Sequence, residues 1–208
     1  DWIDAYRLRR PEHKAAAASV VVDLEPDTPL PVPEPNDVQR QALQALERTR
    51  AEGNKAGLVV LATGLGKTWL AAFDTNREQF PRVLFVAHRE EILNQARDTF
   101  RRIRPDAVLG RFDGEQKDVH SDVIFASIQT ISRVGHLRRF APTAFDYIVV
   151  DEFHHAAAST YRKLIDYFRP RFLLGLTATP ERTDGGDLLT LCQQNVVFRC
   201  DVGEGVRH

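Results

Sequence analysis

The sequence predicts an α/β domain with a doubly wound parallel sheet and helices on both of its faces. Five continuous apolar runs alternate with stretches whose composition suits helices. Strands of a parallel sheet are buried on both faces, so they appear as unbroken apolar runs. Polar side chains follow each run, as expected at the carboxyl edge of such a sheet, where ligands bind. We therefore expect a three-layer α/β/α domain with its ligand site at that edge.

The elements follow one another in a regular order along the chain. Strands are predicted at 58–63, 82–88, 122–127, 146–152 and 172–179. Helices are predicted at 39–52, 67–78, 90–103, 128–140 and 159–168. Either Asn36 or Asp37 is expected to cap the first helix, because a short polar side chain can accept hydrogen bonds from the first helical N–H groups.

Composition excludes several classes of protein. The 208 residues are 43% hydrophobic and 27% charged, which argues against disorder and allows a sizeable core. No apolar run approaches the roughly 18 residues that span a bilayer, and no secretory signal opens the chain. Cys192 and Cys200 are too few for a disulfide framework and resemble ordinary core or surface residues. These features predict a cytoplasmic protein without a membrane partner.

Residues 23–37 are predicted to be an extended linker. They contain five of the chain's 11 prolines, and five acidic residues without any Lys or Arg. Proline fixes φ and removes a backbone donor, so such a segment resists helix formation. Residues 1–22 are then the tail of a preceding module, and 38–208 form the main domain. Since the sequence contains no Met, even at position 1, we expect a piece of a longer protein.

The segment LATGLGKT (61–68) has the composition of a phosphate-binding loop. Gly64 and Gly66 would let backbone N–H groups face phosphate oxygens, Lys67 would supply positive charge, and the Thr68 hydroxyl could bind Mg²⁺. The first position is a glycine in the strict motif and a leucine here. A plain glycine-containing turn between a strand and a helix is the alternative interpretation.

Asp151 and Glu152 are adjacent carboxylates at the end of a predicted strand. Such a pair can divide the work of phosphoryl transfer, with Asp151 holding Mg²⁺ and Glu152 orienting and deprotonating the attacking water. The alternative is a surface acidic pair that opens a loop. The phosphate loop upstream favours the catalytic interpretation.

Six motifs in order resemble those of the first RecA-like motor domain of superfamily 2 helicases and translocases, in their DEAD/DEAH and type III restriction-like forms. The resemblance covers about 39–187. Its segments are VQRQAL (38–43), LATGLGKT (61–68), VLFVAHREEILNQA (83–96), FASIQTI (125–131), DEFHH (151–155) and LTATPERTDG (176–185). The resemblance implies a RecA-like P-loop NTPase fold.

The resemblance also implies a role for each matching residue. The residues expected to bind ATP are Gln39, at the adenine, and Thr63, Gly64, Leu65, Gly66, Lys67 and Thr68. Those expected to catalyse hydrolysis are Lys67, Asp151 and Glu152, with Mg²⁺ on Thr68 and Asp151. Coupling to nucleic acid would fall to His154, Thr177 and Thr179. The nucleic-acid backbone would be contacted by His88, Arg89, Gln129 and Thr130.

Several arginines and one histidine have a competing structural interpretation. A solvated helix face would explain Arg89, Arg97, Arg101, Arg102 and Arg104 equally simply. His155 has no matched role beyond its motif, and a structural histidine would explain it.

The resemblance implies an ATP-dependent motor that acts on nucleic acid, with DNA favoured over RNA by the stretch TATPERTDG (177–185). A second RecA-like domain and an upstream, phospholipase-D-like nuclease module are the expected neighbours in a full-length chain. Two alternatives stay open, namely the motor part of a restriction-type endonuclease and a regulatory module that binds ATP without hydrolysis. We expect the isolated chain to be poorly active. The net charge of −1 changes to +4 when the linker is left out. This mildly basic balance suits local contacts with the phosphates of a nucleic-acid backbone.

Overall fold

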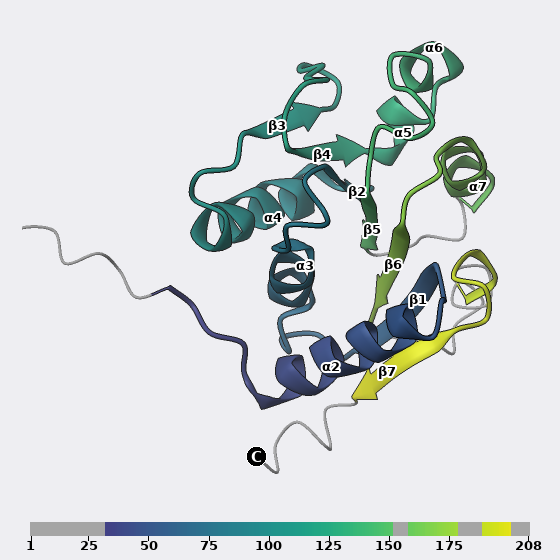
Figure 1. The fold of residues 1–208 in the computed structure, drawn as a ribbon. Helices are drawn as coiled ribbons and strands as arrows, with labels where there is room; N and C mark the ends of the chain where they lie inside the picture. The colour runs from purple at the N-terminus through teal and green to yellow at the C-terminus, as the bar shows by residue number, and fades with distance from the viewer. Residues whose placement is uncertain (1–31, 152–157, 179–188, 201–208) are drawn as a thin grey trace, which may run out of the picture. The chain divides into compact units, whose positions relative to one another are not determined.

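The computed structural model describes residues 32–151, 158–178 and 189–200. Within these ranges the chain forms a seven-stranded sheet in the order β3-β4-β2-β5-β6-β1-β7 (Figure 1). Its strands are β1 (Ala56–Leu61), β2 (Val83–Ala87), β3 (Leu109–Phe112), β4 (Val123–Ser127), β5 (Tyr147–Asp151), β6 (Phe172–Thr177) and β7 (Val196–Cys200). Every neighbouring pair among them is parallel, so their carboxyl ends meet at one edge.

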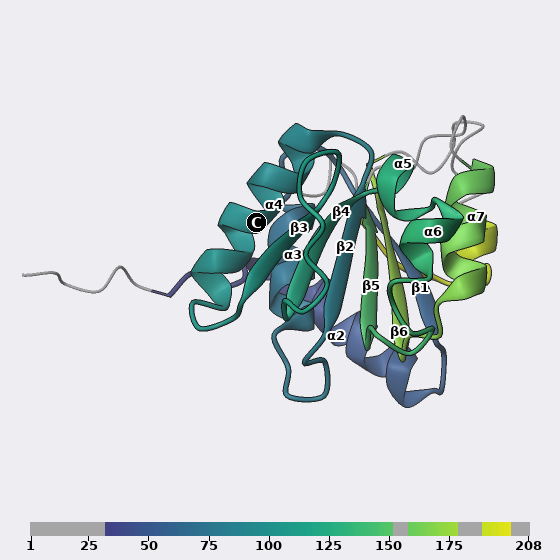
Figure 2. The same ribbon diagram turned by 90° about the horizontal axis from the view of Figure 1, so that it is seen from above.

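Helices cover both faces of the sheet (Figure 2). One face carries α2 (Asp37–Ala51), α3 (Lys67–Thr75) and α4 (Glu90–Ile103). The other carries α5 (Ile128–Ile131), α6 (Val134–Leu137) and α7 (Ala158–Tyr167). The predicted three-layer α/β/α architecture is therefore confirmed. Among the described helices, none is long and apolar enough to cross a membrane.

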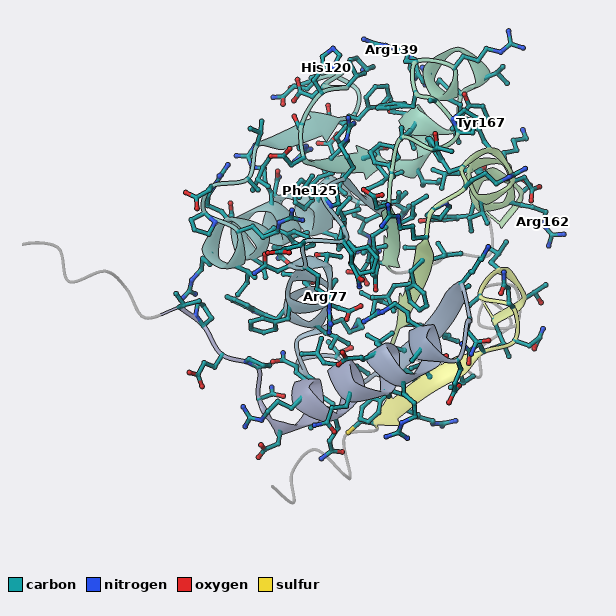
Figure 3. All side chains as sticks on the ribbon, viewed as in Figure 1. Arg77, His120, Phe125, Arg139, Arg162 and Tyr167 are labelled. Carbon is teal, nitrogen blue, oxygen red and sulfur yellow. The ribbon has the colours of Figure 1, made fainter. Side chains whose placement is uncertain are left out.

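The strands divide their side chains between two apolar cores. Val59 packs toward α2, α3 and α4, whereas its neighbour Val60 packs toward α5, α6 and α7. This alternation follows from the two-residue period of a strand. In the first core, Phe125 of β4, which is labelled in Figure 3, meets Phe100 of α4 edge to face at 5.3 Å between ring centroids. The two cores thus hold the helices against the two faces of the sheet.

Asn36 is the residue that caps α2. Its side-chain oxygen accepts a hydrogen bond from the Gln39 N–H at 2.8 Å, and the Gln39 side chain accepts one from the Asn36 N–H at 3.0 Å. This reciprocal arrangement is a capping box, which satisfies two N–H groups at the start of the helix. Asp37, which the sequence assigned to the linker, is instead the first residue of α2.

The sequence missed two strands, β3 and β7. Only four residues form β3, and one of them is Gly110, on which a Cβ would lie 2.2 Å from the Ser121 hydroxyl oxygen. At the opposite edge of the sheet, β7 is largely half-exposed or exposed, so it lacks an unbroken buried run. Short edge strands of this kind do not produce the apolar signal on which the prediction relied.

The single helix predicted at 128–140 was wrong. The structure has two short helices there, α5 and α6, separated at Ser132 and Arg133. Arg133 has φ −65° and ψ 133°, an extended conformation that ends the first helix before the second begins.

Both cysteines are buried thiols outside any disulfide, as expected for core residues. Burial raises the pKa of the Cys192 thiol to about 12, although a backbone hydrogen bond with Gly175 acts in the opposite direction. Because the thiolate is the reactive form, native protein at pH 8 is expected to react slowly with a disulfide reagent such as Ellman's. In urea both thiols should react at the rate of a free cysteine. Rapid labelling of the Cys200→Ser variant without urea would contradict the burial of Cys192.

Candidate functional site

The predicted site residues gather at the carboxyl edge because of the strand order. Strand β6 lies between β1 and β5, and Leu176 pairs with Val59 on one side and with Asp151 on the other. Thr177, the last residue of β6, pairs with Val60. The loop that follows β1, Thr177 and Asp151 therefore lie side by side along one edge, although they are far apart in the sequence.

The phosphate loop turns sharply between β1 and α3. Gly64 and Gly66 have φ values of +89° and +79°, in the left-handed region that favours glycine. A Cβ on Gly66 would also lie 2.5 Å from the Gln39 amide nitrogen, so a side chain is excluded there twice over. Lys67 is the first residue of α3, and its Nζ donates to the Leu61 carbonyl at 3.5 Å. The positive end of α3 and the lysine ammonium thus face the same loop.

Gln39 joins the start of α2 to the phosphate loop. Its side chain is buried, and Nε2 donates to the carbonyls of Gly66 at 3.2 Å and Leu65 at 3.5 Å. Its Oε1 accepts from the Asn36 N–H within the capping box. The two atoms that would read an adenine edge thus each have a protein partner. An adenine bound here would share or replace these bonds.

Asp151 and Thr68 supply the oxygen atoms that a magnesium ion prefers. Asp151 is 3% exposed at the end of β5, and Thr68 lies half-buried in the first turn of α3. Mg²⁺ is usually held by one or two protein oxygens, together with water and substrate phosphates, and the glycine-lined loop leaves room for those phosphates. Within the described ranges, no group of three or more His, Cys, Asp or Glu residues could hold a metal ion. The hydroxyl oxygen of Thr68 and the carboxylate oxygens of Asp151 are the kind of ligand that Mg²⁺ prefers, and the predicted role of both residues in binding ATP–Mg²⁺ stays a prediction.

Three of the predicted site residues, Glu152, His154 and Thr179, lie outside the described residues, and so does His155, for which a structural role was the expectation. Their roles stay predictions.

The predicted nucleic-acid residues lie farther along the same edge, after β2 and β4. Gln129 accepts from the Ser127 hydroxyl at 2.8 Å and donates to the His88 carbonyl at 3.3 Å. It thereby bridges the ends of two adjacent strands. Arg89 is exposed at the start of α4, whereas Thr130 is only 7% exposed. The structure brings His88, Arg89 and Gln129 together at the surface and places Thr130 in the interior.

The arginines of α4 make contacts within the protein. Arg101 donates to the carbonyls of Pro105 and Ala107, and Arg104 donates to the carbonyl of Thr75. The Arg102 guanidinium lies over the Trp69 ring at 5.2 Å. These contacts give a structural role to three of the five arginines for which a solvated helix face was the competing interpretation, although Arg104 is half-buried.

Comparison with known proteins identifies the family. The sequence model of one protein family, described as the type III restriction enzyme res subunit, matches residues 33–182. IRC3 of Saccharomyces cerevisiae, named as an ATP-dependent helicase, is 32% identical over 182 residues, which cover 78% of this chain and 26% of IRC3. The type I restriction enzyme EcoAI endonuclease subunit of Escherichia coli is 30% identical over 161 residues, covering 72% of this chain and 20% of that protein.

A solved structure shows the same fold. It is a nuclease-deletion mutant of the type ISP restriction-modification enzyme LlaGI with a DNA substrate mimic, and it matches with a TM-score of 0.62 at 18% identity. The match covers 84% of this chain and 20% of LlaGI. Together with the phosphate loop and the carboxyl-edge site, these matches show that the chain belongs to the family of the type III restriction enzyme res subunit and is a RecA-like motor domain of the superfamily 2 helicase type.

Proposed function

We propose that the full-length protein is an ATP-dependent DNA helicase or translocase and that this chain is its first motor domain. The observation that carries the proposal is the arrangement of the carboxyl edge. The phosphate loop and Asp151 flank β6, and the candidate backbone contacts His88, Arg89 and Gln129 follow at the ends of β2 and β4. One edge thus combines a site suited to phosphoryl transfer with groups suited to nucleic-acid phosphates.

Each residue at the site has a physical role in hydrolysis. Lys67 and the N–H groups at the start of α3 would neutralise charge that develops on the transferred phosphoryl group. Thr68 and Asp151 would hold Mg²⁺, which supplies further positive charge to the phosphates when bound. Glu152 would orient and deprotonate the attacking water. Thr177 lies between the loop and Asp151, where it could sense the occupancy of both and relay it with His154 and Thr179.

The choice of DNA over RNA rests on the relatives. Two of the matched proteins are restriction enzymes, and one of them was solved with a DNA substrate mimic. The chain spans only about a quarter or less of each matched protein, so its own partners are inferred from theirs. A second RecA-like domain, and a nuclease module upstream of the acidic linker, complete our proposal for a cytoplasmic enzyme.

An ATPase assay on the full-length protein tests the proposal. Hydrolysis is expected to rise severalfold with DNA and less with RNA, when single-stranded DNA, duplex DNA and RNA are compared at one salt concentration. Constant salt matters because phosphate contacts make affinity steeply dependent on ionic strength. Equal stimulation by RNA would remove the preference for DNA. No hydrolysis with any nucleic acid would instead favour a regulatory module that binds ATP without turnover.

The proposal also predicts how a shortened protein behaves. Residues 1–208 alone should bind ATP–Mg²⁺ weakly and hydrolyse it very slowly, because the superfamily 2 motors that the chain resembles complete their ATP site with a second RecA-like domain. Rapid hydrolysis by these residues, stimulated by nucleic acid, would contradict this expectation. The restriction-type alternative requires a cutting site outside this chain, and DNA cleavage by the full-length protein would support it.

A further inference from the structure

Trp69 lies beside the phosphate loop, two residues after Lys67 in the first turn of α3. From the position that a Cβ of Gly66 would occupy, the Trp69 Cδ1 atom is 3.6 Å away and the Gln39 Nε2 atom is 2.5 Å away. The indole edge and the Gln39 amide therefore flank the same point, where the loop becomes helix.

The ring of Trp69 is held in place from a second helix. The Arg102 guanidinium of α4 lies over it at 5.2 Å, and Phe73, one turn along α3, is 6.1 Å away between ring centroids. A cation over a tryptophan face is attracted by the electrons of the ring. Trp69 is nevertheless only half-buried, so part of this fixed aromatic surface is open to solvent.

The strand order decides which end of a bound nucleotide meets this surface. Thr177 ends β6 and Asp151 ends β5, and both strands lie on the same side of the loop. The γ-phosphate, which is the reacting end of a triphosphate, therefore faces that side. The nucleoside then leaves the loop at the other end of the phosphate chain. Gln39 of α2 lies at that end of the loop, and the Trp69 Cδ1 atom approaches the same Gly66, while the rest of its ring extends towards Arg102 of α4.

We infer that Trp69 is a nucleoside contact of this site, packing its indole against the ribose and base of ATP while Arg102 holds the ring. The inference rests on the proposed function, because it requires the triphosphate to bind at the loop. Stacking on an aromatic side chain recognises a nucleoside and is indifferent to inorganic phosphate. Trp69 thus helps the site to select nucleoside triphosphates over other polyphosphates.

Two ligands separate this role from a general effect on the loop. The dissociation constants of ATP–Mg²⁺ and of inorganic tripolyphosphate–Mg²⁺ are measured by calorimetry on the chain of residues 1–208. Trp69→Ala is expected to weaken ATP about tenfold, the size of one stacking contact, and to leave tripolyphosphate unchanged. Trp69→Phe, which keeps an aromatic face, should bind ATP almost as the parent chain does. Arg102→Ala should weaken ATP about two- to fivefold, as expected for the loss of one cation–π contact.

Matched controls remove similar groups that do not face the nucleoside. Tyr167→Leu takes an aromatic ring from α7 on the other face of the sheet, and Arg97→Ala takes an exposed guanidinium from α4. Both are expected to leave the affinity for both ligands unchanged. Far-ultraviolet circular dichroism and the melting temperature show whether each variant is folded.

A spectroscopic readout is independent of the affinities. The chain has two tryptophans, Trp2 and Trp69, so Trp2→Phe leaves Trp69 as its sole indole. ATP–Mg²⁺ is expected to change the fluorescence of this variant, whereas tripolyphosphate–Mg²⁺ should change it little.

Three other outcomes would contradict the inference or the proposed function. Unchanged ATP affinity in Trp69→Ala would remove the nucleoside contact, as would an equal loss for both ligands, which indicates a disturbed loop. The proposed function fails separately, if Lys67→Ala binds tripolyphosphate as tightly as the parent chain does.

Discussion

Lys67→Ala in the full-length protein is expected to abolish ATP hydrolysis, with a loss of at least about a hundredfold in turnover. Lys67 is the first residue of α3, and its ammonium group is held over the loop by the Leu61 carbonyl. Alanine would leave the conformation of Gly64 and Gly66 intact and would remove the one positively charged side chain of segment 61–68. The charge that develops on the phosphoryl group would then lack its main protein counterpart.

The measurement is steady-state ATP hydrolysis with saturating DNA. Lys55→Ala is the matched control, because Lys55 is an exposed lysine that precedes the same strand, β1. It should hydrolyse ATP at the parent rate. Unaltered turnover in Lys67→Ala would refute the assignment of the phosphate loop.

The phosphate loop could be predicted from the sequence because its requirements are local. The two glycines, the lysine and the threonine lie within five residues, between an apolar run and a helix. The contact between Gln39 and the loop could not be predicted in the same way. It joins residues 27 apart, and it depends on the path of α2 across the first face of the sheet.

The central strands could be predicted for a related reason. Strands β1, β2, β4, β5 and β6 are buried on both faces, so they leave continuous apolar runs. The edge strands β3 and β7 have a neighbour on one side only, and their sequences lack such runs. The burial of Thr130 was missed because its role was transferred from a motif. A motif match does not show which face of the short helix α5 packs against the core.

Asp74→Ala is expected to lower the free energy of unfolding by about 3–5 kcal/mol, the usual cost of breaking a buried ion pair on one side. Asp74 is fully buried in α3, and its carboxylate accepts two hydrogen bonds from Arg50 of α2, at 2.6 and 2.8 Å. It also accepts one from the Tyr147 hydroxyl of β5 at 2.6 Å. Burial, followed by the adjacent Asp74 carboxylate, raises the pKa of Tyr147 well above its ordinary value, so the hydroxyl stays a donor.

This cluster joins the three elements that carry the site. Gln39 lies on α2, the phosphate loop leads into α3, and Asp151 ends β5. The Arg50 guanidinium is further enclosed by the rings of Phe172 at 5.1 Å and Phe80 at 5.7 Å. Removal of the carboxylate would leave this guanidinium in an apolar setting with its two strongest bonds unmade.

Thermal and urea unfolding of the chain measure the effect. For a domain of this size the expected loss corresponds to a fall of about 6–20 °C in melting temperature. Asp98→Ala is the matched control, since Asp98 is an exposed acidic residue of α4, and its loss should change stability by no more than about 0.5 kcal/mol. An equal effect of both substitutions would show that the cluster does not hold the three elements together.

A second substitution identifies the source of the loss. Arg50→Met in the Asp74→Ala background removes the unpaired charge and keeps an apolar chain against Phe80 and Phe172. Replacing a whole buried ion pair by apolar groups is often close to neutral, so the double variant should recover a large part of the lost stability. If the double variant is less stable than Asp74→Ala, the cost comes from lost packing between α2, α3 and β5 rather than from an unpaired guanidinium.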